Sequence, residues 1–266
     1  MKTVKIFKYY AFGHDYKLLL NFSEEDTHEE FYDRLKSYFD FIKELELKVT
    51  LSCIDLKDFD VEYDKLGALL KKEPAKKKEK ITKEYHQKII EIINSIDGTL
   101  DAEINTKTAF IPNEKRHSFE YLTERIEVLF GEKVFAQLPS IAQYDFQESG
   151  RCLAFDRNTA SSFHALRGTE DVLKYYYSLL TKRTPTDSQT WYDFANEIEK
   201  EVKNGTIKPA PPADLILNLD SLRKYYRNKT QHPQLIYSSD DSQDLFTNCV
   251  KCVNQIIIDL RTRKLI

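Results

Sequence analysis

Apolar residues recur every three or four positions through most of the C-terminal half of this chain, and that spacing constrains the fold more than any other feature. A helix of 3.6 residues per turn places such residues on one face, which is then buried against other helices. The clearest case begins near Ser239 and Asp240, a serine and an acid suited to a helix start. Its apolar positions are Leu245, Phe246, Cys249, Val250, Val253, Ile256, Ile257 and Leu260. This pattern predicts a final helix with one buried side.

Other stretches have the same periodicity. Helices are predicted over 118–130, 159–181, 191–202 and 214–228 in the second half, and over 23–45, 55–70 and 81–96 in the first, the last of these stopped by Asp97-Gly98. Looser alternation predicts short strands over 1–22 and 47–54, and a strand or an extended connector over 100–111. We therefore expect a mainly α protein. Residues 99–266 would form a helical domain with its core in 150–266, and residues 1–98 an accessory or regulatory region of α or α+β type.

Composition excludes several classes of function. The net charge of −3 rules out a basic coat of the kind that binds duplex nucleic acid nonspecifically, so any nucleic-acid contact has to be local. No apolar run is long enough for a signal peptide or a membrane span, so we expect a cytoplasmic protein without membrane contact. Four scattered cysteines do not suggest a disulfide framework. Seven glycines include no phosphate-loop motif, and neither a cofactor nor a metal is expected.

Three local features each have a functional and a structural interpretation. Cys249 and Cys252 have the spacing of half a zinc site or a redox pair, but their place on the apolar stripe favours core packing. The lysine-rich run 71–80 could bind phosphate, although a solvated helix start is favoured. Charged side chains also recur along 159–181. They could form a site, a surface for a partner chain, or a solvated face with local ion pairs, and the last is favoured. They are His164, Arg167, Glu170, Asp171 and Lys174.

The feature with the most chemical content is Arg227, followed by His232 and Pro233. Five residues apart on one helix, the two side chains would point away from each other. Pro233 disfavours helical backbone at His232, so the helix is expected to end between the two and to let the imidazole fold back toward the guanidinium. A permanent planar cation beside a side chain that titrates near neutrality suits proton transfer at a phosphodiester. Arg157 and His164 form a rival pair.

Four helices at the end of the chain, with Arg227-Asn228 and His232 closing the third, resemble a HEPN domain, a family of mostly prokaryotic ribonuclease folds. The runs 148–155 and 159–170 resemble a group of bacterial HEPN-like proteins, and the resemblance covers about 115–266. It implies that Arg227 and His232 are a catalytic pair, that Asn228 is the polar residue that commonly follows the arginine, and that two copies form a symmetric dimer. The pair Arg157 and His164 does not fit it. Residues 1–98 resemble no family.

Taken together, these observations favour a metal-independent endoribonuclease that cleaves single-stranded RNA, tRNA included, by attack of the RNA's own 2′-hydroxyl. The family suggests phage defence, or a toxin restrained by an antitoxin partner. Further residues expected to contact substrate are Tyr226, Lys229, Arg167, Glu170 and His164. The alternative is a non-catalytic HEPN-like dimeric module that binds protein, nucleotide or RNA. A nucleotide-binding regulator is a third possibility.

Overall fold

The computed structural model describes residues 6–186, 188–230 and 235–266. The chain divides into two compact units, Met1–Phe110 and Ile111–Ile266, and each is described by itself. Every regular element in the described residues is a helix or a helical turn, which confirms the mainly α fold. Across these described ranges no strand occurs, and one isolated antiparallel bridge joins Thr27 to Lys80. None of the helices described has the length and apolar character that a membrane crossing requires.

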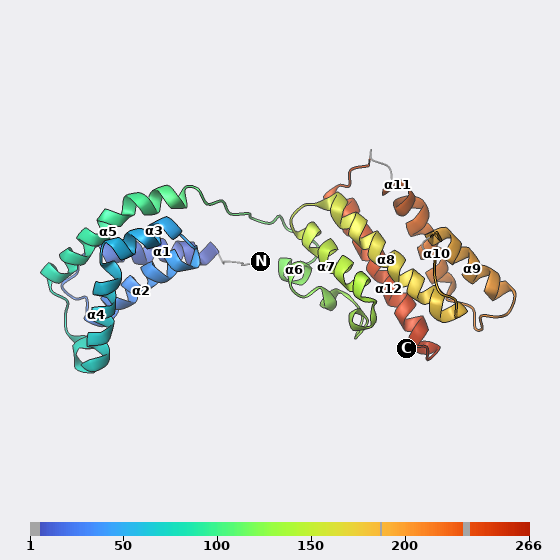
Figure 1. Cartoon of the computed structure of the whole chain (residues 1–266), viewed down its shortest axis with the longest axis horizontal. Coiled ribbons are helices and arrows are strands. Elements are labelled where there is room, and N and C mark those ends of the chain that lie inside the picture. Colours follow the sequence, from blue (N-terminus) through green and yellow to red (C-terminus); the bar gives the residue numbers. More distant parts are fainter. Residues whose placement is uncertain (1–5, 187, 231–234) are drawn as a thin grey trace. The chain divides into compact units, whose positions relative to one another are not determined.

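In its described residues, 6–110, the first unit contains five α-helices (Figure 1). They are α1 (Ile6–Leu20), α2 (His28–Glu44), α3 (Lys48–Leu56), α4 (Phe59–Lys72) and α5 (Lys83–Ile104), with a short 3₁₀ turn η1 (Pro74–Lys78) after α4. Its core is made of aromatic and branched aliphatic residues on facing helices. Among the fully buried members are Phe31, Leu35, Ile42, Ile54, Ile89, Ile93 and Ile96.

The strands predicted in this unit are wrong. Within 1–22 the structure describes α1, where Phe7 and Tyr10 are strongly exposed. Within 47–54 it describes α3, where Val49 is exposed. Exposed apolar residues do not mark one helix face, so the apolar pattern loses its 3.6-residue period and resembles alternation. The expected helix stop at Gly98 is also wrong, because α5 continues to Ile104 and Gly98 has open space around it.

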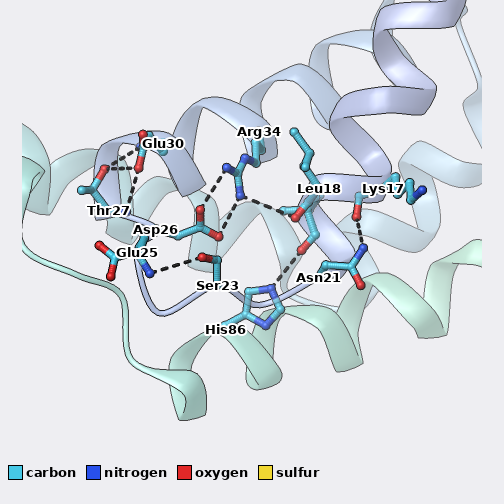
Figure 2. Close-up of polar contacts among 11 residues, drawn as sticks. Lys17, Leu18, Asn21, Ser23, Glu25, Asp26, Thr27, Glu30, Arg34 and His86 are labelled. Carbon is cyan, nitrogen blue, oxygen red and sulfur yellow. Dashed lines mark hydrogen bonds and ion pairs between the residues drawn. The ribbon is translucent and has the colours of Figure 1, made fainter.

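The connection between α1 and α2 is fixed by polar contacts (Figure 2). The guanidinium of Arg34 donates to both oxygens of Asp26, at 2.9 and 3.0 Å. His86, buried on α5, lies with its Nε2 2.9 Å from the carbonyl oxygen of Leu19. Thr27 begins α2 with a capping box, in which its hydroxyl accepts from the Glu30 amide and the Glu30 carboxylate accepts from the Thr27 amide. The contacts of His86, Thr27 and Glu30 satisfy backbone groups that helix ends leave unpaired.

Lysines of the run 71–80 pair with acids of the same unit. Nζ of Lys77 lies 2.8 Å from Oε1 of Glu29, and Nζ of Lys80 lies 2.7 Å from Oε2 of Glu25. Lys76 pairs with Glu73, three residues before it, at 3.2 Å. The run is therefore partly neutralised, but it is not the start of a helix as expected, because it forms the end of α4 and the turn η1, and α5 begins only at Lys83.

The second unit is built around two long helices, α8 (Asn158–Thr181) and α12 (Ser239–Thr262), which pack along each other (Figure 1). The helix α7 (Ser140–Ala154) packs on α8, and so does α9 (Trp191–Lys203). The remaining elements are α6 (Phe119–Thr123), the 3₁₀ turns η2 (Ile126–Leu129) and η3 (Phe135–Gln137), α10 (Ala213–Ser221), the π-helical segment η4 (Leu222–Arg227) and α11 (Asn228–Thr230).

Helices predicted over 159–181 and 191–202 and after Ser239 are confirmed by α8, α9 and α12. The helix predicted over 118–130 is wrong in part, because α6 ends at Thr123 and is followed by the 3₁₀ turn η2. The stretch predicted as one helix over 214–228 is helical to Thr230, but it changes type from α to π at Leu222.

The apolar stripe of the last helix is buried throughout, and it includes Cys249 and Cys252. Burial raises the pKa of the Cys252 thiol to about 12 and raises that of Cys249 still further above the usual range. Within the described ranges no group of three or more potential ligands could hold a metal ion. Both cysteines therefore belong to the hydrophobic core, as their position on the stripe predicted.

Candidate functional site

A pocket of about 280 Å³ lies in the second unit, between α8 and the segment formed by η4 and α11. Its walls come from stretches that are about 60 residues apart in the sequence. The lining residues are Phe163, His164, Leu166, Arg167, Glu170, Arg227 and Thr230. Four of them, His164, Arg167, Glu170 and Arg227, are charged or titratable.

The polar wall is one side of α8. His164, Arg167 and Glu170 follow one another at three-residue intervals, so they lie on neighbouring turns of the same side of the helix. Intervening residues such as Ala165 and Thr169 are buried against the core. The burial of this apolar side fixes the rotation of α8, and the rotation turns the polar series toward the pocket.

Asp145 on α7 connects two of these side chains. The aspartate is fully buried, and its carboxylate accepts a hydrogen bond from Nδ1 of His164 at 2.9 Å. It also accepts from Nε and Nη2 of Arg167, at 2.7 and 2.5 Å. The hydrogen bonds from Arg167 to this carboxylate raise the pKa of the guanidinium. One carboxylate thus orients both a histidine and an arginine on the pocket wall.

The close approach of α7 and α8 depends on Gly168. A Cβ atom at this position would lie 3.2 Å from the Cβ of Asp145 and 3.1 Å from the ring of Phe146. Such contacts are shorter than ordinary van der Waals separations, so a side chain here would force Asp145 or Phe146 to shift by a few tenths of an ångström. Glycine therefore allows Asp145 to reach the polar wall.

Arg227 enters the pocket from the other side, at the end of η4. Its Nη2 lies 3.3 Å from Oε2 of Glu170. Its Nε is buried and has no hydrogen-bond partner among the described residues. The amide of Asn228 donates to the carbonyl of Arg223, five residues back, which is the hydrogen bond of a π turn. Single π turns occur frequently at functional sites, and this one directly precedes the pocket wall at Thr230.

The charges around the pocket are balanced. Arg167 is paired with Asp145, and Arg227 is paired with Glu170. The ion pairs expected within α8 are not found for these residues, because their partners are on α7 and η4, whereas Arg167 is exposed to solvent as the favoured interpretation expected. An anion can still bind the guanidinium N–H groups that the carboxylates do not use, since each arginine carries five. The pocket therefore combines the planar guanidinium donors of Arg167 and Arg227 with the imidazole of His164.

The structure brings together Arg227, His164, Arg167 and Glu170, four of the residues singled out in the sequence. Three others do not line this pocket. The side chains of Asn228 and Lys229 are exposed to solvent, and Tyr226 is half-buried. Tyr226 contributes instead to a second pocket of about 290 Å³, whose lining also includes Tyr225, Asn248 and Lys251.

His232, the second member of the predicted pair, lies outside the described residues, and so does Pro233. Of the rival pair, His164 lines the pocket and bonds to Asp145, whereas Arg157 is exposed at the start of α8 and does not line it. Sequence reasoning missed Asp145. The available signal was a charged residue within the apolar pattern of α7, next to the buried Ala142 and Phe146. No protein-family model matches the chain, and neither a curated protein nor a solved structure matches it.

Proposed function

We propose that the unit formed by residues 111–266 is a HEPN-type, metal-independent endoribonuclease that cleaves single-stranded RNA. The observation that carries this proposal is the pocket in which Arg227 lies beside His164 and Arg167. The spacing of Arg227 from His232 in the sequence predicts a catalytic role for the arginine. The helix α8 adds a second guanidinium, from Arg167, and the imidazole of His164. Planar guanidinium donors are suited to phosphate oxygens.

In the proposed reaction the 2′-hydroxyl of the RNA attacks the adjacent phosphorus. The 5′-oxygen of the next nucleotide leaves, and the products carry a 2′,3′-cyclic phosphate and a 5′-hydroxyl. Arg227 holds the negative charge that develops on the non-bridging oxygens, and His232 moves a proton. Asn228 follows Arg227 on an exposed turn, where it is available to a long substrate. No step of this reaction needs a cofactor.

A single-stranded substrate suits the surroundings of the site. Tyr225, two residues before Arg227, is exposed and lines the neighbouring pocket with Tyr226. Unpaired bases stack on aromatic side chains, whereas bases within a duplex are not free to do so. Lys229 is exposed one residue further along and can contact the backbone. A tRNA loop is one substrate with such bases.

Two copies of the chain would place two Arg227 and His232 motifs at a shared cleft, as the resemblance to HEPN domains implies. A cytoplasmic homodimer active in phage defence, or restrained by an antitoxin partner, is the corresponding biological setting. Residues 1–98 would then serve as a regulatory region.

The pairing of Arg227 with Glu170 favours a second candidate, a non-catalytic module that binds RNA, nucleotide or protein. A guanidinium already engaged by a carboxylate contributes less to the stabilisation of a transition state. The experiment that separates the two uses a short labelled single-stranded RNA in the presence of EDTA. An enzyme of the proposed type cleaves it and does not cleave the same strand with a 2′-deoxy residue at the cut site. Binding without cleavage at high protein concentration would support the non-catalytic module.

A further inference from the structure

We propose that His164 is the general base of this site and that Asp145 is the residue that positions it. This inference rests on the proposed function and assigns a role to a residue outside the Arg227 motif. It follows from the geometry of the contact between α7 and α8, in which a buried carboxylate fixes one nitrogen of an imidazole that lines the pocket.

The contact with Asp145 determines which nitrogen of His164 can accept a proton. A carboxylate oxygen is a hydrogen-bond acceptor, so the Nδ1 that lies 2.9 Å from Oδ1 of Asp145 carries the hydrogen. In the neutral ring the lone pair is then on Nε2. Within the described ranges Nε2 has no hydrogen-bond partner, and the side chain keeps a quarter of its surface exposed. The basic nitrogen is thus free on a residue that lines the cavity.

A structural role alone does not require this histidine. Arg167 already satisfies Asp145, because its Nε donates to one carboxylate oxygen and its Nη2 to the other. Such a bidentate ion pair gives each oxygen of the buried carboxylate a hydrogen bond. The bond from His164 is added to it, and its effect is to hold the ring in one orientation. A carboxylate that orients an imidazole in this way is a recurring arrangement in general base catalysis.

Charged and titratable groups surround His164 on every element near it. From α7 come Asp145 and Tyr144, whose ring centre is 6.4 Å from that of the imidazole. The helix α8 itself contributes Arg167 and Glu170 to the same pocket, and η4 contributes Arg227. A phosphate held by the guanidinium of Arg227 would lie in the cavity that His164 lines.

In the proposed step, Nε2 of His164 takes the proton from the 2′-hydroxyl while the bond from the 2′-oxygen to phosphorus forms. The bond from phosphorus to the 5′-oxygen breaks, and that oxygen receives a proton from solvent water. His164 then returns its proton to solvent.

The test measures single-turnover cleavage of a short single-stranded RNA in EDTA as a function of pH. The decisive variant is His164→Asn, because the asparagine amide can still donate to Asp145 and so preserve the helix contact. We expect its rate to fall by about 10²- to 10⁴-fold. We also expect its rate to depend less on pH than the wild-type rate does, because the proposed base has been removed. His117→Asn, a change at a half-buried histidine away from the pocket, serves as the control and should leave rate and profile unchanged.

A second variant, His164→Ala, keeps the proposal testable if the first folds poorly. Imidazole added to the solution should restore part of its activity, which it would not do for a residue with a purely structural role. If wild type cleaves RNA while His164→Asn cleaves it at the same rate and with the same pH profile, His164 is not the base and the inference fails alone. If wild type does not cleave RNA at all, the proposed function fails and this inference fails with it.

Discussion

Nη2 of Arg227 lies 3.3 Å from Oε2 of Glu170, so the end of η4 is held against the polar side of α8. The two residues are 57 positions apart in the sequence, and their pairing decides how much positive charge the pocket can offer to a phosphate. Removal of the carboxylate should therefore separate binding from catalysis.

The Glu170→Gln variant is expected to bind single-stranded RNA more tightly than wild type, because a negative charge beside the phosphate site is lost. The loss should also reduce cleavage, since Arg227 is no longer held in one orientation. Both effects can be followed with a non-cleavable 2′-deoxy strand for affinity and an RNA strand for rate. Weaker binding in this variant would show that Glu170 contacts the substrate directly.

Arg227→Ala should abolish most cleavage while the fold is retained. Loss of one group that stabilises charge in a transition state costs about 10²- to 10³-fold in rate. Lys224→Ala is a matched control, because it removes the same charge from the same segment at an exposed side chain that pairs with Asp220 and does not line the pocket. Equal losses of activity in the two variants would indicate a general electrostatic effect and contradict the site.

Asp145→Ala is expected to destabilise the second unit by about 1–3 kcal/mol, because a fully buried carboxylate with three hydrogen bonds is replaced by a cavity and unpaired donors. Asp220→Ala is the comparison. That acid is partly exposed and pairs with Arg223 and Lys224, so its loss should cost less than about 1 kcal/mol. Urea unfolding monitored by circular dichroism measures both. A cost for Asp145→Ala no greater than that for Asp220→Ala would contradict the importance of the buried contact.

Two glycines in helices should respond in opposite directions to substitution by alanine. At Gly150 on α7 a Cβ atom would lie 2.5 Å from the carbonyl oxygen of Leu122 and 2.6 Å from Cδ1 of Ile126, so Gly150→Ala should cost about 1–3 kcal/mol. At Gly98 on α5 nothing lies within 4 Å, and Gly98→Ala should stabilise the helix by about 0.5–1 kcal/mol. The measurement is again urea unfolding, and stabilisation by Gly150→Ala would show that α6 and α7 are packed less closely than described.

Part of this architecture could be predicted from the sequence, for an identifiable reason. The helices α8, α9 and α12 bury a continuous apolar side, so their periodicity is visible in the order of residues. Helices α1 and α3 expose large apolar residues such as Phe7 and Leu56, which hide the period. The continuation of α5 through Gly98 had no local signal either, because glycine is tolerated inside a helix that is stabilised by tertiary packing.

The candidate site could be predicted only as separate pieces. Arg227 was found through its spacing from His232, and the polar series of α8 through its regular recurrence. That these two pieces share one pocket depends on the packing of η4 against α8, which no local pattern contains. The role of Asp145 depends likewise on the close approach that Gly168 permits.

The most direct test of the central claim is to incubate the purified protein with total cellular RNA in a chelator and to map the ends of the fragments. The proposed chemistry predicts new ends at single-stranded positions, with 2′,3′-cyclic phosphates and 5′-hydroxyls. It also predicts that these ends are absent with the Arg227→Ala and His232→Ala variants. Intact RNA, or cleavage that requires a metal ion or leaves 5′-phosphates, would contradict the account.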